Sequence, residues 1–209
     1  GGDIMREESI ITLITRRIDE APFGSAFVTS DFTDLAEYET AKKTIARLEK
    51  KGKLRRVLRG VYDKPQFSSL LQEYAAPIPD QIAHAIARNY NWTISASGNT
   101  ALNQLGLSEQ VPADWSYISS GPYKEYTFGN VTLTFSHRSD SQMIGMSEKT
   151  LLIIQALKAI GQGNVSETDM RRIRNRLSSK DCQAILSESR HTISWIYEVI
   201  KEICRMEKE

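Results

Sequence analysis

Apolar residues recur at helical spacing through the N-terminal part of the chain. Ile10, Ile14 and Ile18 keep this spacing and predict a first helix over 6–21, which Pro22 ends. One face of this helix is apolar and the other is charged, as expected for a helix that packs on a core. The chain therefore begins with a predicted amphipathic helix.

A short strand and a second helix are predicted next. Phe27–Val28 predicts the strand. A cap at Thr29 or Ser30, followed by an acidic first turn, predicts a helix over 31–36.

The third predicted helix has the clearest apolar stripe. It is expected to begin at Thr40, and Ala41, Ile45 and Leu48 give it one side that faces a core. Gly52 supplies a left-handed stop, and lysines fill the last turn, where they complement the helix dipole.

After the third helix the periodicity changes from that of a helix to that of a strand. Residues 54–58 and 61–62 predict two short strands around a tight turn at Arg59 and Gly60. Strict alternation would place Arg56 inward between two leucines, so we expect a bulge or a twist in the first strand. This order of helix, strand, helix, turn, helix and hairpin is typical of a winged helix-turn-helix.

The remainder predicts a second domain. An N-terminal winged-helix domain (1–65) is expected to lead through a Pro-containing connector (66–79) into a C-terminal domain (66–209). The elements predicted there are helices over 80–90, 98–105, 151–160, 166–177 and 187–206 and strands near 92–94, 115–119 and 125–135. The predicted fold class is α+β: an N-terminal winged helix-turn-helix followed by an α+β domain with a small antiparallel sheet and a helical C-terminal tail.

Charge is distributed unevenly along the chain. Residues 40–62 contain nine basic residues and one acid, Glu49, whereas the whole chain has 27 basic and 26 acidic residues. The rest of the chain is left with 18 basic and 25 acidic residues, so a net charge of +8 lies in this stretch and −7 outside it. Such segregation attracts phosphates at one place. The alternative is a solvated helix face beside an ordinary basic hairpin.

The basic stretch supplies the candidate DNA contacts. Recognition helices place their N-terminal residues nearest the base edges, so Thr40, Lys43 and Thr44 are predicted to meet bases, and Arg47 a guanine or a phosphate. Arg59 is the best wing contact, and the pattern does not decide between Arg55 and Arg56. The predicted DNA-binding residues are Thr40, Lys42, Lys43, Thr44, Arg47, Lys51, Arg55, Arg56 and Arg59. The predicted partner is double-stranded DNA.

Cysteine spacing and hydropathy bear on metal binding and on membrane association. Cys182 and Cys204 are widely separated and form no zinc-ligand spacing, so neither a metal nor a cofactor is predicted. The longest apolar run, near 151–154, is far too short to cross a bilayer, and no signal peptide is visible. We expect a cytoplasmic protein with no membrane partner.

An enzyme is the weakest of the alternatives. Its candidate residues are His84, Arg88, Ser97, Asn99 and Asn103. His84 and Arg88 are four residues apart and can share a helix face, and Ser97 at a helix start suits either an anion site or a simple cap. The sequence has no nucleophile elbow, P-loop, kinase signature or metalloprotease motif. We therefore predict that the protein is not an enzyme.

Two blocks of sequence resemble a known family. The first joins PFGS at 22–25 and DF at 31–32 to RLEKKGKLRRVLRGVYDKP at 47–65, and the second is IAHAIARNYNWTISASGNTALNQLGLSEQVPADWSYISSGP at 82–122. Together they resemble the DUF6088 family, a branch of the AbiEi-like antitoxins of type IV toxin–antitoxin systems. The resemblance covers roughly 21–138, with departures at Ala96, where proline is expected, and at Glu109, where a small polar residue is expected.

The resemblance implies a DNA-binding antitoxin that represses its own operon and takes part in phage defence. It also implies that the C-terminal domain counteracts a nucleotidyltransferase-like toxin, typically without forming a stable complex with it. A stand-alone winged-helix regulator, with a C-terminal domain that senses a ligand or dimerises, stays open as the alternative.

Overall fold

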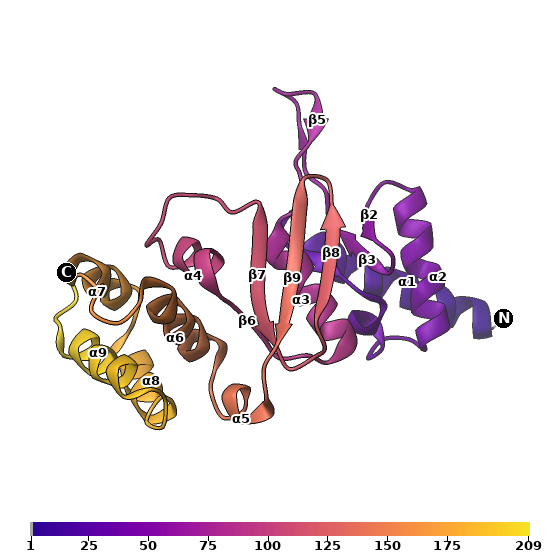
Figure 1. The fold of residues 1–209 in the computed structure, drawn as a ribbon. Helices are drawn as coiled ribbons and strands as arrows, with labels where there is room; N and C mark the ends of the chain where they lie inside the picture. The colour runs from indigo at the N-terminus through magenta and orange to yellow at the C-terminus, as the bar shows by residue number, and fades with distance from the viewer. Residues whose placement is uncertain (1) are drawn as a thin grey trace. The chain divides into compact units, whose positions relative to one another are not determined.

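The computed structural model of the chain describes residues 2–209 (Figure 1). Its contacts divide the chain into two compact units, one that ends at Trp92 and one that runs from Thr93 to Glu209. The boundary expected from the sequence was near residue 65. It differs because the helix after the predicted connector packs on the first unit.

The first unit contains the six elements predicted for residues 1–65, in the predicted order. They are α1 (Gly2–Glu20), β1 (Ala26–Phe27), the 3-10 helix η1 (Thr29–Phe32), α2 (Tyr38–Lys50), β2 (Arg55–Leu58) and β3 (Val61–Asp63). The strands form a three-stranded antiparallel sheet in the order β1-β3-β2. The helix expected over 31–36 is shorter and tighter than predicted, and α2 begins two residues before Thr40.

One apolar cluster holds these elements together. Its buried members are Ile14, Ile18, Phe27, Phe32, Ala41, Ile45, Leu48 and Leu54. They come from α1, β1, η1, α2 and the start of the hairpin, so each predicted stripe faces a common core. Burying an isoleucine or leucine side chain contributes roughly 1.5–3 kcal/mol, so this cluster is the main source of stability for the first unit.

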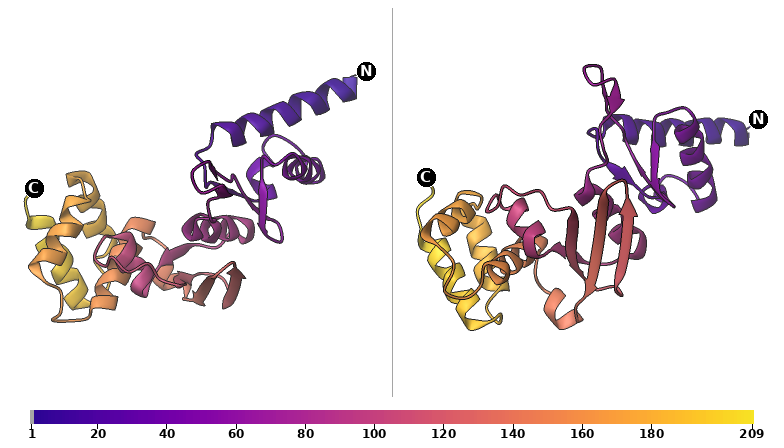
Figure 2. Two further views of the ribbon diagram at one scale, coloured as in Figure 1. Left: turned by 90° about the horizontal axis from the view of Figure 1, so that it is seen from above. Right: turned by 45° about the horizontal axis from the view of Figure 1, so that its top comes forward.

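The stretch predicted as a connector contains structure of its own. Strands β4 (Phe67–Ser68) and β5 (Glu73–Tyr74) pair as a small antiparallel hairpin, which extends away from the rest of the first unit (Figure 2). Helix α3 (Pro79–Tyr90) then packs on β1, β3 and η1. The side chain of Arg88 fixes this docking, since its guanidinium donates to both carboxylate oxygens of Asp31 at 2.8 and 3.1 Å.

The second unit is built around a four-stranded sheet. Its elements are β6 (Ile94–Ala96), α4 (Gly98–Gln104), β7 (Asp114–Ser119), β8 (Lys124–Phe128), β9 (Val131–His137), α5 (Asp140–Met143), α6 (Glu148–Ile160), α7 (Glu167–Asn175), α8 (Ser179–Glu188) and α9 (Ser194–Arg205). The strand order is β6-β7-β9-β8 (Figure 1). The pairs β6-β7 and β8-β9 are antiparallel, as expected, but the central pair β7-β9 is parallel.

Helices cover this sheet and continue to the end of the chain. Both α4 and α6 contact the sheet, where Tyr117, Leu133 and Phe135 are fully buried. Helix α7 begins with a capping box, in which the Asp169 N–H donates to the Ser166 hydroxyl at 3.0 Å and the Ser166 N–H donates to the Asp169 carboxylate at 3.2 Å. No helix among the described residues is long and apolar enough to cross a bilayer.

Candidate nucleic-acid interface

Helix α2 presents a basic face to solvent. Its buried face points into the core of the first unit, and the opposite side carries the exposed side chains of Lys42, Lys43, Arg47 and Lys50. These positions follow one another at helical spacing, so they lie on one side of the helix. Lys51, at the C-terminal end of the helix, is also exposed.

The prediction for Thr44 is wrong. Thr44 is only 3% exposed, and its hydroxyl donates to the Thr40 carbonyl at 2.9 Å. A buried stripe at 41, 44, 45 and 48 is what a helix of 3.6 residues per turn produces, and Thr44 lies in its middle. Its side chain therefore cannot meet a base. Thr40 itself is half-buried.

The hairpin after α2 separates the two neighbouring arginines that the sequence could not distinguish. Arg55 is held by the fully buried Asp63, with guanidinium-to-carboxylate distances of 3.0 and 2.7 Å, and it also donates to the Ala75 carbonyl at 2.9 Å. The prediction of Arg55 as a DNA contact is therefore not supported by its position. Arg56 is exposed, and the expected bulge is confirmed between Arg56 and Leu58.

The tip of the hairpin is a second exposed position. Arg59 is exposed next to Gly60, whose φ of 75° is a left-handed conformation that favours glycine. The Leu54 N–H donates to the Leu48 carbonyl at 3.4 Å, so β2 follows directly on the last turn of α2.

Seven basic residues of this region are exposed, and their side chains have no ion pair or hydrogen bond with any described residue. We call them the basic surface set: Lys42, Lys43, Arg47, Lys50, Lys51, Arg56 and Arg59. Two other lysines of the first unit are engaged instead. Lys53 pairs with Asp19 at 3.1 Å, and Lys64 donates to the carbonyls of Asp19 and Ala21 at 2.9 and 2.8 Å.

The N-terminal end of α2 adds residues that the sequence did not suggest. Because the Ala41 N–H donates to the Glu37 carbonyl at 2.9 Å, the first turn contains Tyr38 and Glu39. Glu37 and Glu39 are exposed acids, which disfavour a phosphate at this helix end. Tyr38 is 50% exposed and offers a ring and a hydroxyl to a nucleic acid. In the sequence, the signal for these residues is an aromatic residue between two acids directly before the predicted start of the helix.

Comparison with known proteins identifies a family. Residues 13–185 match the family described as a family of unknown function, DUF6088. The chain belongs to the DUF6088 family. No curated protein matches. Among solved structures, this DUF6088 protein is similar to the crystal structure of RV2827C protein from Mycobacterium tuberculosis, with 14% identity and a TM-score of 0.40 over 92% of this chain and 74% of that chain.

The residues considered for catalysis fall in different units of this DUF6088 protein. His84 and Arg88 belong to α3 in the first unit, where Arg88 is held by Asp31 and His84 Nδ1 lies 2.8 Å from the Asp80 carbonyl oxygen. Ser97, Asn99 and Asn103 belong to the second unit. The Ser97 side chain makes no capping hydrogen bond, and the Asn103 amide donates to the Gln110 carbonyl at 3.0 Å. His84, Arg88 and Asn103 therefore make local structural contacts, and the five candidate residues are divided between the two units.

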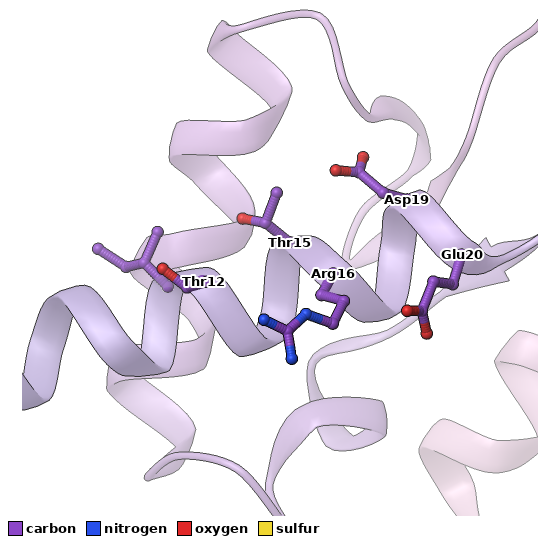
Figure 3. A pocket seen from close by; sticks show the side chains of 6 residues that line it. Thr12, Thr15, Arg16, Asp19 and Glu20 are labelled. Carbon is purple, nitrogen blue, oxygen red and sulfur yellow. The ribbon is translucent and has the colours of Figure 1, made fainter.

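A shallow hollow on α1 carries no site. It is lined by Ile11, Thr12, Thr15, Arg16, Asp19 and Glu20 (Figure 3). All six belong to one helix, so no second element encloses a ligand there.

Proposed function

We propose that this DUF6088 protein binds duplex DNA through the basic surface set on α2 and the β2–β3 hairpin. The observation that carries the proposal is the exposure of seven cations without a partner among the described residues, next to Arg55, Lys53 and Lys64, which are engaged by the fold. Exposed, unpaired cations in a row suit a polyphosphate backbone, whose neutralisation releases counterions.

The order of elements in the first unit supports a winged helix-turn-helix interpretation. In that interpretation α2 is the recognition helix, with Lys43 and Arg47 toward the groove, and Arg59 at the hairpin tip contacts the backbone. The acids at the start of α2 favour phosphate contacts along the middle and end of the helix rather than at its N-terminus.

Fluorescence anisotropy with a labelled duplex tests DNA binding. If about five phosphates are contacted, log K falls against log salt with a slope of about −4 to −5. The variant Lys43→Ala/Arg47→Ala/Arg59→Ala should flatten this slope by about three. Lys180→Ala/Arg190→Ala/Arg205→Ala is a matched control, because it removes the same charge from exposed positions of the second unit. A slope near zero for the unmodified protein, or equal losses in both variants, contradicts the proposal.

The resemblance to AbiEi-like antitoxins supports a second step: repression of the protein's own operon and antagonism of a nucleotidyltransferase-like toxin. We propose that the two activities are separable, since the basic surface set is confined to the first unit. A chain beginning at Phe67 would lack β1 and η1, on which α3 packs, so its folding would be disturbed. The full-length triple variant is therefore the better test.

Co-expression with a neighbouring nucleotidyltransferase-like gene measures antagonism as growth rescue. The triple variant should lose the mobility shift of the upstream DNA and keep the rescue. If a folded triple variant loses both, antagonism depends on the DNA-binding surface. If the unmodified protein gives no rescue, the antitoxin function is wrong while DNA binding still stands on its own test.

A further inference from the structure

The second unit contains a partly open pocket that the proposed DNA binding does not use. Its volume is about 590 Å³, within the range typical of small-molecule sites. Its walls come from Ile118 of β7, Arg138 directly after β9, the segment around α5, helix α6, the end of α8 and the connection from α8 to α9. These helices and strands are labelled in Figure 1. Several elements therefore surround the space, in contrast to the hollow on α1.

Part of the lining is apolar, both at the buried end of the pocket and at its entrance. Ile118, Leu151 and Ile154 line the cavity from the buried core of the second unit. Ile144 and Ile193 also line it, yet they are 71% and 50% exposed. Covering these two side chains with an apolar ligand would remove their surface from water, which is favourable.

Cations outnumber acids along the lining. Arg138 and Lys158 contribute two cationic side chains, against one acidic side chain. Among the described residues, the Arg138 guanidinium donates to the carbonyl of its neighbour His137 alone, at 2.9 Å, and Lys158 has no ion pair. Both keep donors for a ligand.

Glu188 is the only acid among the lining residues. Burial acts to raise the pKa of its carboxyl, but hydrogen bonds from the hydroxyls of Thr150 and Ser147 outweigh this and leave the pKa lowered. The carboxylate is thus already engaged by two donors from the start of α6. It does not compete strongly for the Arg138 or Lys158 side chains.

We propose that this cavity binds a small amphipathic carboxylate, with its apolar body against Ile118, Leu151 and Ile154 and its anionic group near Arg138 and Lys158. Ligand sites commonly combine apolar walls with a few polar groups that set the ligand's orientation. Charge fixes the orientation, because the Arg138 and Lys158 side chains in the lining can donate charge-assisted hydrogen bonds to a carboxylate.

Isothermal titration calorimetry with octanoate tests the proposal, and octanol is the uncharged comparison. The full-length protein should bind one octanoate saturably and more tightly than octanol. Arg138→Gln/Lys158→Gln should weaken octanoate binding at least tenfold and leave octanol binding unchanged. Lys180→Gln/Arg205→Gln is the matched control, since both of its positions are exposed and outside the lining. It should leave octanoate binding unchanged.

A second variant tests the apolar entrance. Ile144→Glu adds a carboxylate at an exposed position, so it should fold normally and weaken octanoate binding at least tenfold. The proposal is overturned if octanoate shows no saturable binding to the full-length protein. It is equally overturned if the Arg138→Gln/Lys158→Gln variant binds octanoate as the unmodified protein does, or if the control variant loses as much affinity.

Discussion

Each unit of this protein has a helix rich in basic residues, and the two units use them differently. The basic surface set around α2 is exposed and unpaired among the described residues. The arginines of α7 and the residue after it are Arg171, Arg172, Arg174 and Arg176. All four are engaged: Arg171 pairs with Glu167 and Glu209, and the other three donate to backbone carbonyls of distant segments.

The comparison shows why a run of basic residues is not by itself a binding site. An arginine that donates to the free carbonyls at the end of a neighbouring helix uses its hydrogen-bond donors within the fold. A lysine or arginine on an unpaired helix face keeps that capacity for an external partner. Both clusters are rich in basic residues, but only the basic surface set has side chains that are available to an external partner. Substitutions that remove one basic side chain at a time test this difference.

The largest effect is expected at Arg174. Its side chain is 8% exposed and donates to the Met206 and Leu177 carbonyls at 2.8 and 2.6 Å. Arg174→Met removes both donors and should lower the free energy of unfolding by about 3 kcal/mol, measured by urea denaturation. Arg205→Met is the control, because Arg205 is exposed and should change stability by about 0.5 kcal/mol or less.

Neither variant is expected to alter the DNA affinity of the folded protein. A loss of less than about 1 kcal/mol for Arg174→Met would mean that the engaged arginines contribute no more than exposed ones.

The next effect separates the neighbours Arg55 and Arg56. Arg55→Ala leaves the fully buried Asp63 without its guanidinium, so we expect a loss of about 2 kcal/mol in unfolding free energy. Arg56→Ala should cost about 0.5 kcal/mol or less, and it should reduce the steepness of the salt dependence of DNA binding by about one. Urea denaturation and anisotropy on both variants measure the contrast. If Arg56→Ala destabilises the protein more than Arg55→Ala, we have assigned the two side chains the wrong way round.

A smaller effect distinguishes Thr44 from Lys43 on the same helix. Thr44→Val removes a buried hydroxyl whose acceptor is the Thr40 carbonyl, and it should cost about 1 kcal/mol of stability with no change in DNA preference. Lys43→Ala should leave stability nearly unchanged and weaken DNA binding. Anisotropy with duplexes of different sequence checks both. A changed sequence preference in Thr44→Val alone would show that the buried side of α2 influences the groove.

Local patterns predicted much of the first unit. The apolar stripes of α1 and α2, the stop at Gly52, the hairpin around Gly60 and the bulge after Arg56 all follow from spacing within a few residues. Thr44 was predicted to face the DNA because threonine occurs on both the buried and the exposed face of a helix. Its position beside Ala41, Ile45 and Leu48 places it on the buried face.

The remaining differences depend on partners far apart in the chain. The role of Arg55 is set by Asp63, its register partner across the bulged hairpin. The packing of α3 depends on an ion pair between Arg88 and Asp31, which are separated by 57 positions. The parallel pairing of β7 with β9 requires β8 to occupy the outer edge of the sheet. No local periodicity contains this information.

The smallest effect concerns an exposed pair that belongs to neither cluster. The Arg17 guanidinium donates to both carboxylate oxygens of Asp34 at 2.8 Å and lowers the pKa of that carboxyl. A lowered folded-state pKa means that the pair stabilises the fold above the ordinary aspartate pKa of about 4, and that this contribution is lost as the pH falls through the lowered value. Asp34→Asn should therefore lower the urea midpoint slightly at pH 7, and the difference from the unmodified protein should shrink as the pH falls through the lowered pKa of Asp34. Denaturation at several pH values measures it, with Asp3→Asn as an exposed control without this pairing. A difference that grows as the pH falls would have the wrong sign for an ion pair, and Arg17 would then stabilise the fold mainly through its bond to the Asp31 carbonyl at 2.7 Å.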